Sequence, residues 1–239
     1  MSQLVKLLRS AGRSSGRPTA GFGTRGQDSG RKRLIVVAAL DSADAGKARA
    51  AFQAGADAVE IPYRVKLPDL KDLTAAGPVG LSFSGSVPGD FDFRALEDSG
   101  LDYVSVEAGD VPAGVLLLEG PSVVVAVKES FSDTMLKTLN FLPARIIQVD
   151  APENVARFTV KQAMEKRVGR ELIGKPLLLK VGPGIKPEAA QVLALVAPNG
   201  LIVPAADVAA WKAAVADLKE PSEDDDGGAS NISLKAPAA

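Results

Sequence analysis

The sequence predicts a single (βα)8 barrel with an extension at each end, and three observations lead to this fold class. Short apolar segments alternate with amphipathic segments along residues 34–219, which is the pattern of a parallel sheet covered by helices. Eight such pairs are present, the number that closes a TIM barrel. An open doubly wound sheet shows the same alternation, but no Gly-x-Gly-x-x-Gly follows the first strand here. We therefore expect the closed barrel.

The eight expected strands are short, apolar and rich in β-branched residues, as parallel strands covered on both faces are. They are residues 34–40, 58–62, 79–84, 103–107, 123–128, 145–150, 177–181 and 200–203. The helices are clearest where apolar residues recur at three- and four-residue spacing. They are residues 43–54, 153–170, 187–196 and 207–219. The fourth unit is the weakest, because residues 111–118 leave room for two helical turns at most.

Charge separates the two ends of the chain from its middle. Residues 1–33 carry eight basic side chains against one acid, a net charge of +7, and residues 220–239 carry five acids against one lysine, a net charge of −4. Both segments are rich in small and polar residues, which is typical of disorder. We expect a basic, largely flexible arm over 1–33 with a short amphipathic helix at 2–9, a barrel over 34–219 and a disordered acidic tail over 220–239.

Three roles are open for the amphipathic helix at 2–9: packing on the barrel, lying on a membrane surface, or docking on another protein. The two charged extensions favour self-association or binding of a protein partner. The basic arm has only one aromatic residue, Phe22, so we expect no specific nucleic-acid binding. No apolar run approaches the roughly 18 residues of a transmembrane helix, and none is expected.

The composition removes several kinds of chemistry. The chain has no Cys and no His, which excludes disulfides, thiolate nucleophiles, Cys-ligated metals and the commonest general base. The missing Cys fits a cytoplasmic location. We expect no cofactor and no metal site. Asp41, Glu107 and Asp150 could hold Mg²⁺ between them, but acids at strand ends more often cap the next turn or helix.

Three segments carry a resemblance to a known superfamily. LIVVAALD at 34–41, GADAVEI at 55–61 and VGPGI at 181–185 resemble the ribulose-phosphate-binding barrels, which include orotidine-phosphate decarboxylases and hexulose-phosphate synthases. The resemblance implies a (βα)8 fold over 34–219 and a loop after the seventh strand that wraps a substrate phosphate.

The chain departs from that superfamily at two places. The catalytic Asp-x-Lys-x-x-Asp set of the superfamily belongs on the third strand, where this chain has LSFSGS at 81–86. The loop after the eighth strand contains Asp207, which would repel a phosphate. The resemblance therefore implies the fold but not the reaction, and the family's active site is degenerate here.

Candidate site residues lie at the carboxyl ends of the strands, where barrel enzymes carry their sites. Lys180 follows three leucines, and a desolvated lysine amine is suited to Schiff-base chemistry. Its alternative role is an ion pair with an interior carboxylate such as Glu60, which could itself be a general base or a buried structural acid. Asp150 ends the sixth strand. Gly182 and Gly184 could bind an anion through backbone N–H groups, or could simply form a tight turn.

Two functions follow from these residues. We expect a degenerate barrel that serves as a non-catalytic binding or assembly module. The alternative is a lyase or aldolase that uses Lys180, with Glu60 or Asp150, on a small carbonyl substrate, phosphorylated or not. An open pocket at the strand ends that gathers Lys180, Glu60 and Asp150 would favour the enzyme.

Overall fold

The computed structural model describes residues 2–13, 34–64, 70–84, 87, 91–109, 111–128 and 131–218. The rest of the expected basic arm, from residue 14 to residue 33, and the whole expected acidic tail, 220–239, lie outside the described residues.

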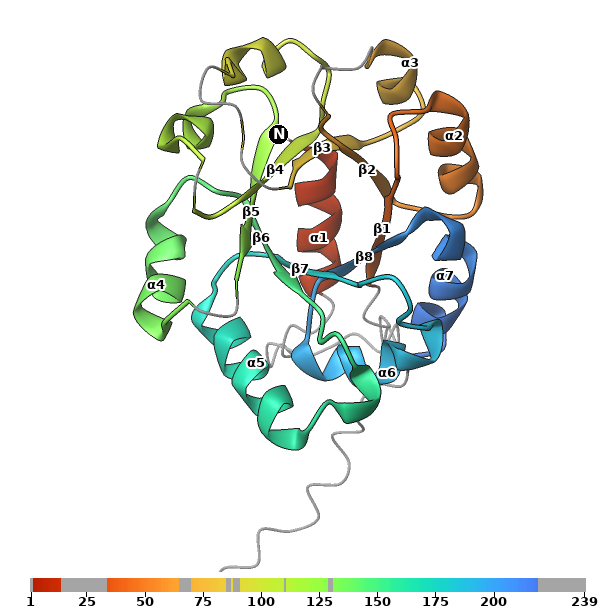
Figure 1. Cartoon of the computed structure of the whole chain (residues 1–239), viewed down its shortest axis with the longest axis vertical. Coiled ribbons are helices and arrows are strands. Elements are labelled where there is room, and N and C mark those ends of the chain that lie inside the picture. The colour runs from red at the N-terminus through yellow and green to blue at the C-terminus, as the bar shows by residue number, and fades with distance from the viewer. Residues whose placement is uncertain are drawn as a thin grey trace, which may run out of the picture.

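Eight parallel strands close into a barrel in the order of the chain (Figure 1). They are β1 (Ile35–Ala39), β2 (Ala58–Pro62), β3 (Val79–Phe83), β4 (Tyr103–Glu107), β5 (Ser122–Val127), β6 (Ile146–Asp150), β7 (Leu177–Lys180) and β8 (Gly200–Pro204). Each strand pairs with its neighbours in parallel, and β8 returns to β1 along five residue pairs. The (βα)8 TIM barrel is confirmed, and every expected strand end lies within one residue of the observed one.

Helices cover the outside of the barrel. The α-helices are α2 (Ala45–Gln53), α3 (Lys71–Thr74), α4 (Asp133–Thr138), α5 (Val160–Leu172), α6 (Ala190–Leu193) and α7 (Val208–Ala216). The 3-10 helices are η1 (Phe93–Leu96), η2 (Ala113–Leu117), η3 (Leu139–Phe141), η4 (Val155–Arg157), η5 (Pro187–Ala189), η6 (Ala194–Val196) and η7 (Ala205–Asp207).

The expected helix over 153–170 is divided in the structure. After η4, the helix α5 is capped by Thr159, whose side chain accepts a hydrogen bond from the Gln162 amide while the Gln162 side chain accepts one from the Thr159 amide. This capping box supplies the helix with its own start at Val160, seven residues later than expected. In the fourth unit, the segment over 111–118 forms only the 3-10 helix η2, in line with its short length.

The main hydrophobic core lies between the sheet and the helices. It is built from the outward side chains of the strands, such as Val36, Leu81 and Leu179, and from buried helix residues such as Leu193 and Trp211. Outward residues alternate with inward ones along each strand, so a second core fills the barrel itself.

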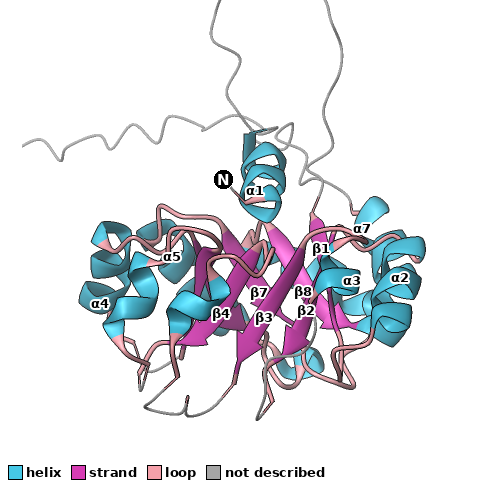
Figure 2. Ribbon diagram, turned by 90° about the horizontal axis from the view of Figure 1, so that it is seen from above, coloured by secondary structure: helices cyan, strands magenta, loops and turns pink. Residues whose placement is uncertain are grey.

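The second core contains an additional helix, α1 (Gln3–Arg13), which closes the end of the barrel where the strands begin (Figure 2). Its side chains Leu4, Val5 and Leu8 are buried against the inward residues of the strands. Those residues are Ile35, Val37, Ala58, Tyr103, Val124, Ile146, Leu178 and Ile202. Of the three roles open for this segment, the described residues show packing on the barrel.

One acid fixes the start of α1. Asp102, just before β4, accepts hydrogen bonds from the Ser2 hydroxyl at 2.6 Å, the Gln3 amide at 2.6 Å and the Leu4 amide at 2.9 Å. A carboxylate at the amino end of a helix satisfies its free N–H groups and interacts favourably with its dipole. Among the helices described, none is long and apolar enough to cross a membrane.

Candidate functional site

The interior of the barrel changes from apolar to polar towards the carboxyl ends of the strands. The inward polar side chains include Glu60 on β2, Ser82 on β3, Ser105 on β4, Gln148 on β6 and Lys180 on β7. Of these five, Lys180 is half-buried and the other four are buried. Burial of polar groups costs free energy unless they are hydrogen-bonded, so such a cluster marks a candidate site.

A small pocket of about 90 Å³ opens among these residues at the ends of β3 to β7. Lys180 and Asp150 both line it, and the two residues are direct register partners on β7 and β6. Ser82, Ser105 and Gln148 form polar parts of its wall, and the Ser105 hydroxyl donates to Gln148 Oε1 at 3.2 Å. We call this pocket the mouth pocket.

Glu60 does not line the mouth pocket but lies inside the barrel within reach of the Lys180 charge. Its side chain is 3% exposed, and burial raises its pKa above the ordinary value. The charge of Lys180 and a hydrogen bond with the Ser82 side chain lower the same pKa, but less than burial raises it. Glu60 Oε2 has no hydrogen-bond partner among the described residues. The structure thus brings Lys180 near both predicted carboxylates, but only Asp150 shares the pocket with it.

Gln148 belongs to this cluster but is not among the candidate site residues predicted from the sequence. The signal was present: side chains two apart share a face of a strand, so the predicted site at Asp150 places Gln148 on the inner face as well. At the outer edge of the mouth pocket, Lys128 and Glu107 form an exposed ion pair with Lys128 Nζ 3.5 Å from Glu107 Oε2.

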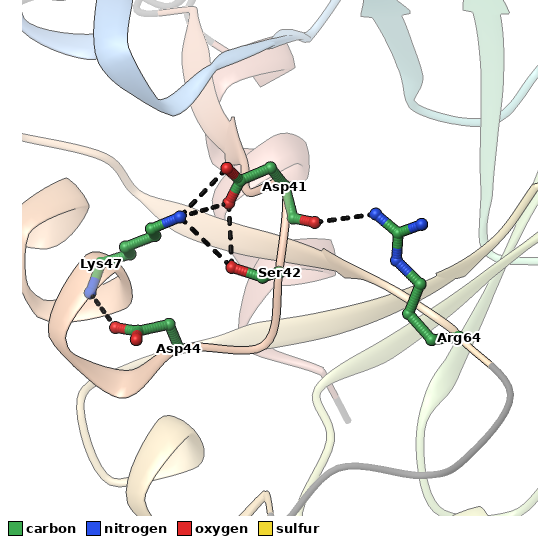
Figure 3. A network of polar contacts seen from close by, with 5 residues as sticks. All are labelled: Asp41, Ser42, Asp44, Lys47 and Arg64. Atoms are coloured by element: carbon green, nitrogen blue, oxygen red, sulfur yellow. Dashed lines mark hydrogen bonds and ion pairs between the residues drawn. The ribbon is translucent and has the colours of Figure 1, made fainter.

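Asp41, the first of the three acids considered for Mg²⁺, belongs to a separate network at the end of β1 (Figure 3). Lys47 Nζ lies 2.7 Å from Asp41 Oδ1 and 3.0 Å from Oδ2, and the Ser42 hydroxyl donates to Oδ1. Arg64 donates to the Asp41 carbonyl, and Asp44 caps α2 through the Lys47 amide. The hydrogen bonds from Lys47 and Ser42 lower the pKa of Asp41. These contacts shape the turn between β1 and α2.

Within the described ranges, no group of three or more Asp or Glu side chains is placed to hold a metal ion.

The loop after β7 contains Gly182 and Gly184. Gly184 has φ +92°, a backbone conformation that favours glycine, and the Ile185 amide donates to the Gly182 carbonyl at 3.3 Å. A Cβ added at either glycine would meet nothing within 4 Å. The loop is therefore a tight turn with an open surface, and its ability to bind an anion stays a prediction.

Comparison with solved structures finds other TIM barrels at low sequence identity. A tryptophan synthase structure from Mycobacterium tuberculosis aligns with a TM-score of 0.59 at 14% identity, covering 90% of this chain and 95% of that one. Thiamine phosphate pyrophosphorylase from Pyrococcus furiosus aligns with a TM-score of 0.55 at 14% identity, covering 76% and 92%. A mutant tryptophan synthase alpha-subunit from Pyrococcus furiosus aligns with a TM-score of 0.58 at 15% identity, covering 78% and 98%.

No protein-family model matches the sequence. No curated protein matches it either. The structural likeness is therefore one of fold: the chain resembles these TIM-barrel proteins, and at these identities the likeness extends no further.

Proposed function

We propose that the mouth pocket binds a small carbonyl compound and that Lys180 attacks its carbonyl carbon, as in a lyase or aldolase. The observation that carries this proposal is the position of Lys180. Lys180 is half-buried on the inner face of β7, lines the mouth pocket beside Asp150, and lies close enough to the buried Glu60 for its charge to act on that carboxyl.

The polar cluster is costly for the barrel, which supports a functional role. An unsatisfied buried polar group costs about 1–3 kcal/mol, and more if it is charged. The opposite half of the same barrel is filled with apolar side chains and α1, so the fold itself does not require polar residues in its interior. Buried polar groups that are retained in an open end of a TIM barrel are candidates for binding and catalysis.

The proposed chemistry uses groups of this chain only. The Lys180 nitrogen forms a bond to the carbonyl carbon, the carbonyl oxygen takes up a proton, and loss of water leaves an imine between lysine and substrate. The Ser82 hydroxyl, which lines the pocket and hydrogen-bonds Glu60, relays a proton from the Glu60 carboxyl to the departing water, and Asp150 is a base at the pocket surface. The hydroxyls of Ser82 and Ser105 would hydrogen-bond the oxygens of the substrate.

The size of the pocket limits the substrate. The described lining encloses about 90 Å³, the space of about three water molecules in the liquid. This volume holds the carbonyl end of a substrate, and Lys128 and Asp150 also border a larger open cavity. A phosphate on such a substrate would have to lie outside the mouth pocket, and the backbone of Gly182 and Gly184 is the surface we propose for it.

Borohydride trapping tests the proposal. The protein is incubated with a panel of small aldehydes, ketones and sugar phosphates, reduced, digested and mapped by mass spectrometry. We expect an adduct on Lys180 that is lost in Lys180→Met. Lys128→Met is the matched control, because Lys128 lines the same pocket at its exposed edge and should leave the adduct unchanged. Absence of any adduct on Lys180 would overturn the enzyme proposal.

A non-catalytic binding or assembly module is the second candidate, and the surface of α5 favours it. Val160, Met164 and Val168 are 78%, 64% and 52% exposed and lie four residues apart, so they form an apolar stripe along one helix. Exposed apolar patches often mark protein contacts. Light scattering of the wild type and of Met164→Lys tests this candidate: an equal molar mass that is monomeric in both would exclude self-association through α5.

A further inference from the structure

A second cavity lies at the other end of the barrel, beside α1, and is independent of the mouth pocket. It measures about 480 Å³ and is bordered by residues just before β6, β7 and β8, among them Ala144, Pro176 and Asn199. Four of its lining residues are cationic, namely Arg9, Arg145, Arg170 and Lys175, and none is acidic. We call it the cationic cavity.

Two of the four cations have structural partners. Arg170 donates to the carbonyls of Ala197 and Ile173 and to the Asn199 side chain. Lys175 donates to the carbonyls of Leu142 and Ala144. These bonds explain why the two side chains lie where they do, but carbonyls do not neutralise their charge.

The other two cations have no such explanation. The side chains of Arg9 and Arg145 are exposed and make no hydrogen bond or ion pair within the described part of the chain. Arg145 also repels its neighbour: burial and the charge of Arg145 both lower the pKa of Lys175. A cavity that gathers like charges without a carboxylate is complementary to an anion.

The same chain contains an acidic segment, which begins at residue 220, shortly after α7. Helix α7 follows β8, and its residue Lys212 pairs with Asp57 just before β2, so α7 runs back towards the end of the barrel that holds the cationic cavity. Residues 220–226 then contain five acids and no base. At about 3.3 Å per residue, the eight residues from 219 to 226 reach up to about 26 Å beyond Leu218.

The pattern continues beyond the acidic run. Ile232 and Leu234 are the next large apolar residues of the segment. Next to the cationic cavity, Phe141 is 87% exposed and Leu142 is 37% exposed, and the Leu142 carbonyl is a partner of Lys175. The cationic cavity, which borders β6 to β8, thus adjoins an apolar surface formed by Phe141 and Leu142 before β6. The sequence of the segment has the matching order, first acids and then Ile and Leu.

We propose that the segment 220–234 docks across this end of the barrel, with the carboxylates of 223–226 in the cationic cavity and Ile232 and Leu234 on Phe141 and Leu142. Because the segment is tethered to α7 by a few residues, its effective concentration is on the order of millimolar, and individually weak ion pairs suffice to hold it. The contact is electrostatic in its first half and is therefore weakened by salt.

The absence of Cys makes the test direct, since Ala229→Cys provides a single site for a nitroxide spin label in the full chain. The readout is paramagnetic broadening of backbone amide signals in the ¹⁵N-labelled protein. At about 0.1 M salt we expect selective broadening at Arg9, Arg145 and Gly174, and its loss at about 1 M salt, where charges are screened within about 3 Å.

Charge variants decide whether the cavity is the docking site. Arg145→Glu, and separately the triple change of Asp224, Asp225 and Asp226 to Asn, should each abolish the broadening at low salt. Arg49→Glu on α2 is the matched control: Arg49 is an exposed arginine outside the cavity, and the same charge change there should leave the broadening in place.

Three results would overturn the proposal. The first is the absence of selective broadening at low salt, and the second is broadening that persists in Arg145→Glu. The third is seen in a mixture of two samples: broadening of a ¹⁵N-labelled chain that carries no nitroxide, caused by an unlabelled chain that carries one. The third result would assign the segment to a second copy of the protein. In each variant, amide signals of the rest of the barrel that match those of the wild type show that the variant is folded.

Discussion

The ring of Tyr103 fills the space that a side chain on Gly80 would need. The two residues are register partners on β3 and β4, and both point into the barrel. A Cβ built on Gly80 would lie 2.1 Å from Cζ of Tyr103, far inside van der Waals contact. Gly80 thus admits a large aromatic side chain into a narrow barrel, and that ring belongs to the same apolar cluster as α1.

We predict that Gly80→Ala destabilises the protein. Overpacking of a core usually costs about 1–3 kcal/mol, and the buried ring has little room to move. The cost should be much smaller in a Tyr103→Ala background, because the clash is then absent. Urea unfolding followed by the fluorescence of Trp211, the single tryptophan, measures both costs. Equal costs in the two backgrounds would show that the Tyr103 ring is not the obstacle.

A second prediction concerns the attachment of α1. Asp102→Ala removes the acceptor of three hydrogen bonds at the start of this helix, and we expect a loss of about 2 kcal/mol in unfolding free energy. Asp98→Ala is the control, because Asp98 is an exposed acid on the same connection and should change stability by less than about 0.5 kcal/mol. Similar losses in both variants would mean that α1 does not depend on this cap.

The sequence predicts the barrel well because its strands are simple to recognise. Parallel strands buried on both faces are apolar throughout, and Gly or Pro near their ends limits their length. The helices are harder to delimit. The start of α5 was missed although Thr159 and Gln162 have the spacing of a capping box, since the apolar pattern continues on both sides of it.

Long-range contacts explain what the sequence could not predict. The bond between Ser2 and Asp102 joins residues 100 positions apart, and neither residue has a local pattern that indicates the other. Similarly, Arg9 and Arg145 meet at one cavity only because α1 enters the barrel. The site at the strand ends was easier, because the topology alone places Asp150 beside Lys180.

A third prediction addresses the link between α7 and the sheet. Asp57 Oδ2 accepts hydrogen bonds from the Val36 amide at 2.8 Å and from Lys212 Nζ at 2.5 Å, and the Asp57 side chain is 9% exposed. Lys212→Met removes the cation from a largely buried carboxylate, so we expect a loss of about 1–3 kcal/mol.

The control for this prediction is Lys161→Met, which breaks an exposed pair with Glu165 on α5. Exposed pairs of this kind contribute less than about 0.5 kcal/mol, so urea unfolding should show little change. If the two lysine variants lose the same stability, burial does not strengthen the pair between Asp57 and Lys212.

The last prediction uses the pH dependence of stability to detect the buried carboxyl of Glu60. Its pKa is raised from the ordinary value of 4.5, mainly by burial. Above pH 4.5 the unfolded chain has lost this proton while the folded protein still holds it, so the folded state binds more protons. The contribution of Glu60 is therefore complete below pH 4.5 and is lost as the pH rises towards the folded-state pKa, by at most about 1.4 kcal/mol per pH unit.

Glu60→Gln removes the titrating group, so its stability should fall less with rising pH than that of the wild type. Urea unfolding at several pH values between about 5 and 8 measures the two slopes. Glu153→Gln, at an exposed acid, should keep the wild-type slope. Parallel curves for wild type and Glu60→Gln would mean that Glu60 ionises as readily in the barrel as in the unfolded chain, and it could then not supply the proton that we assign to it through Ser82.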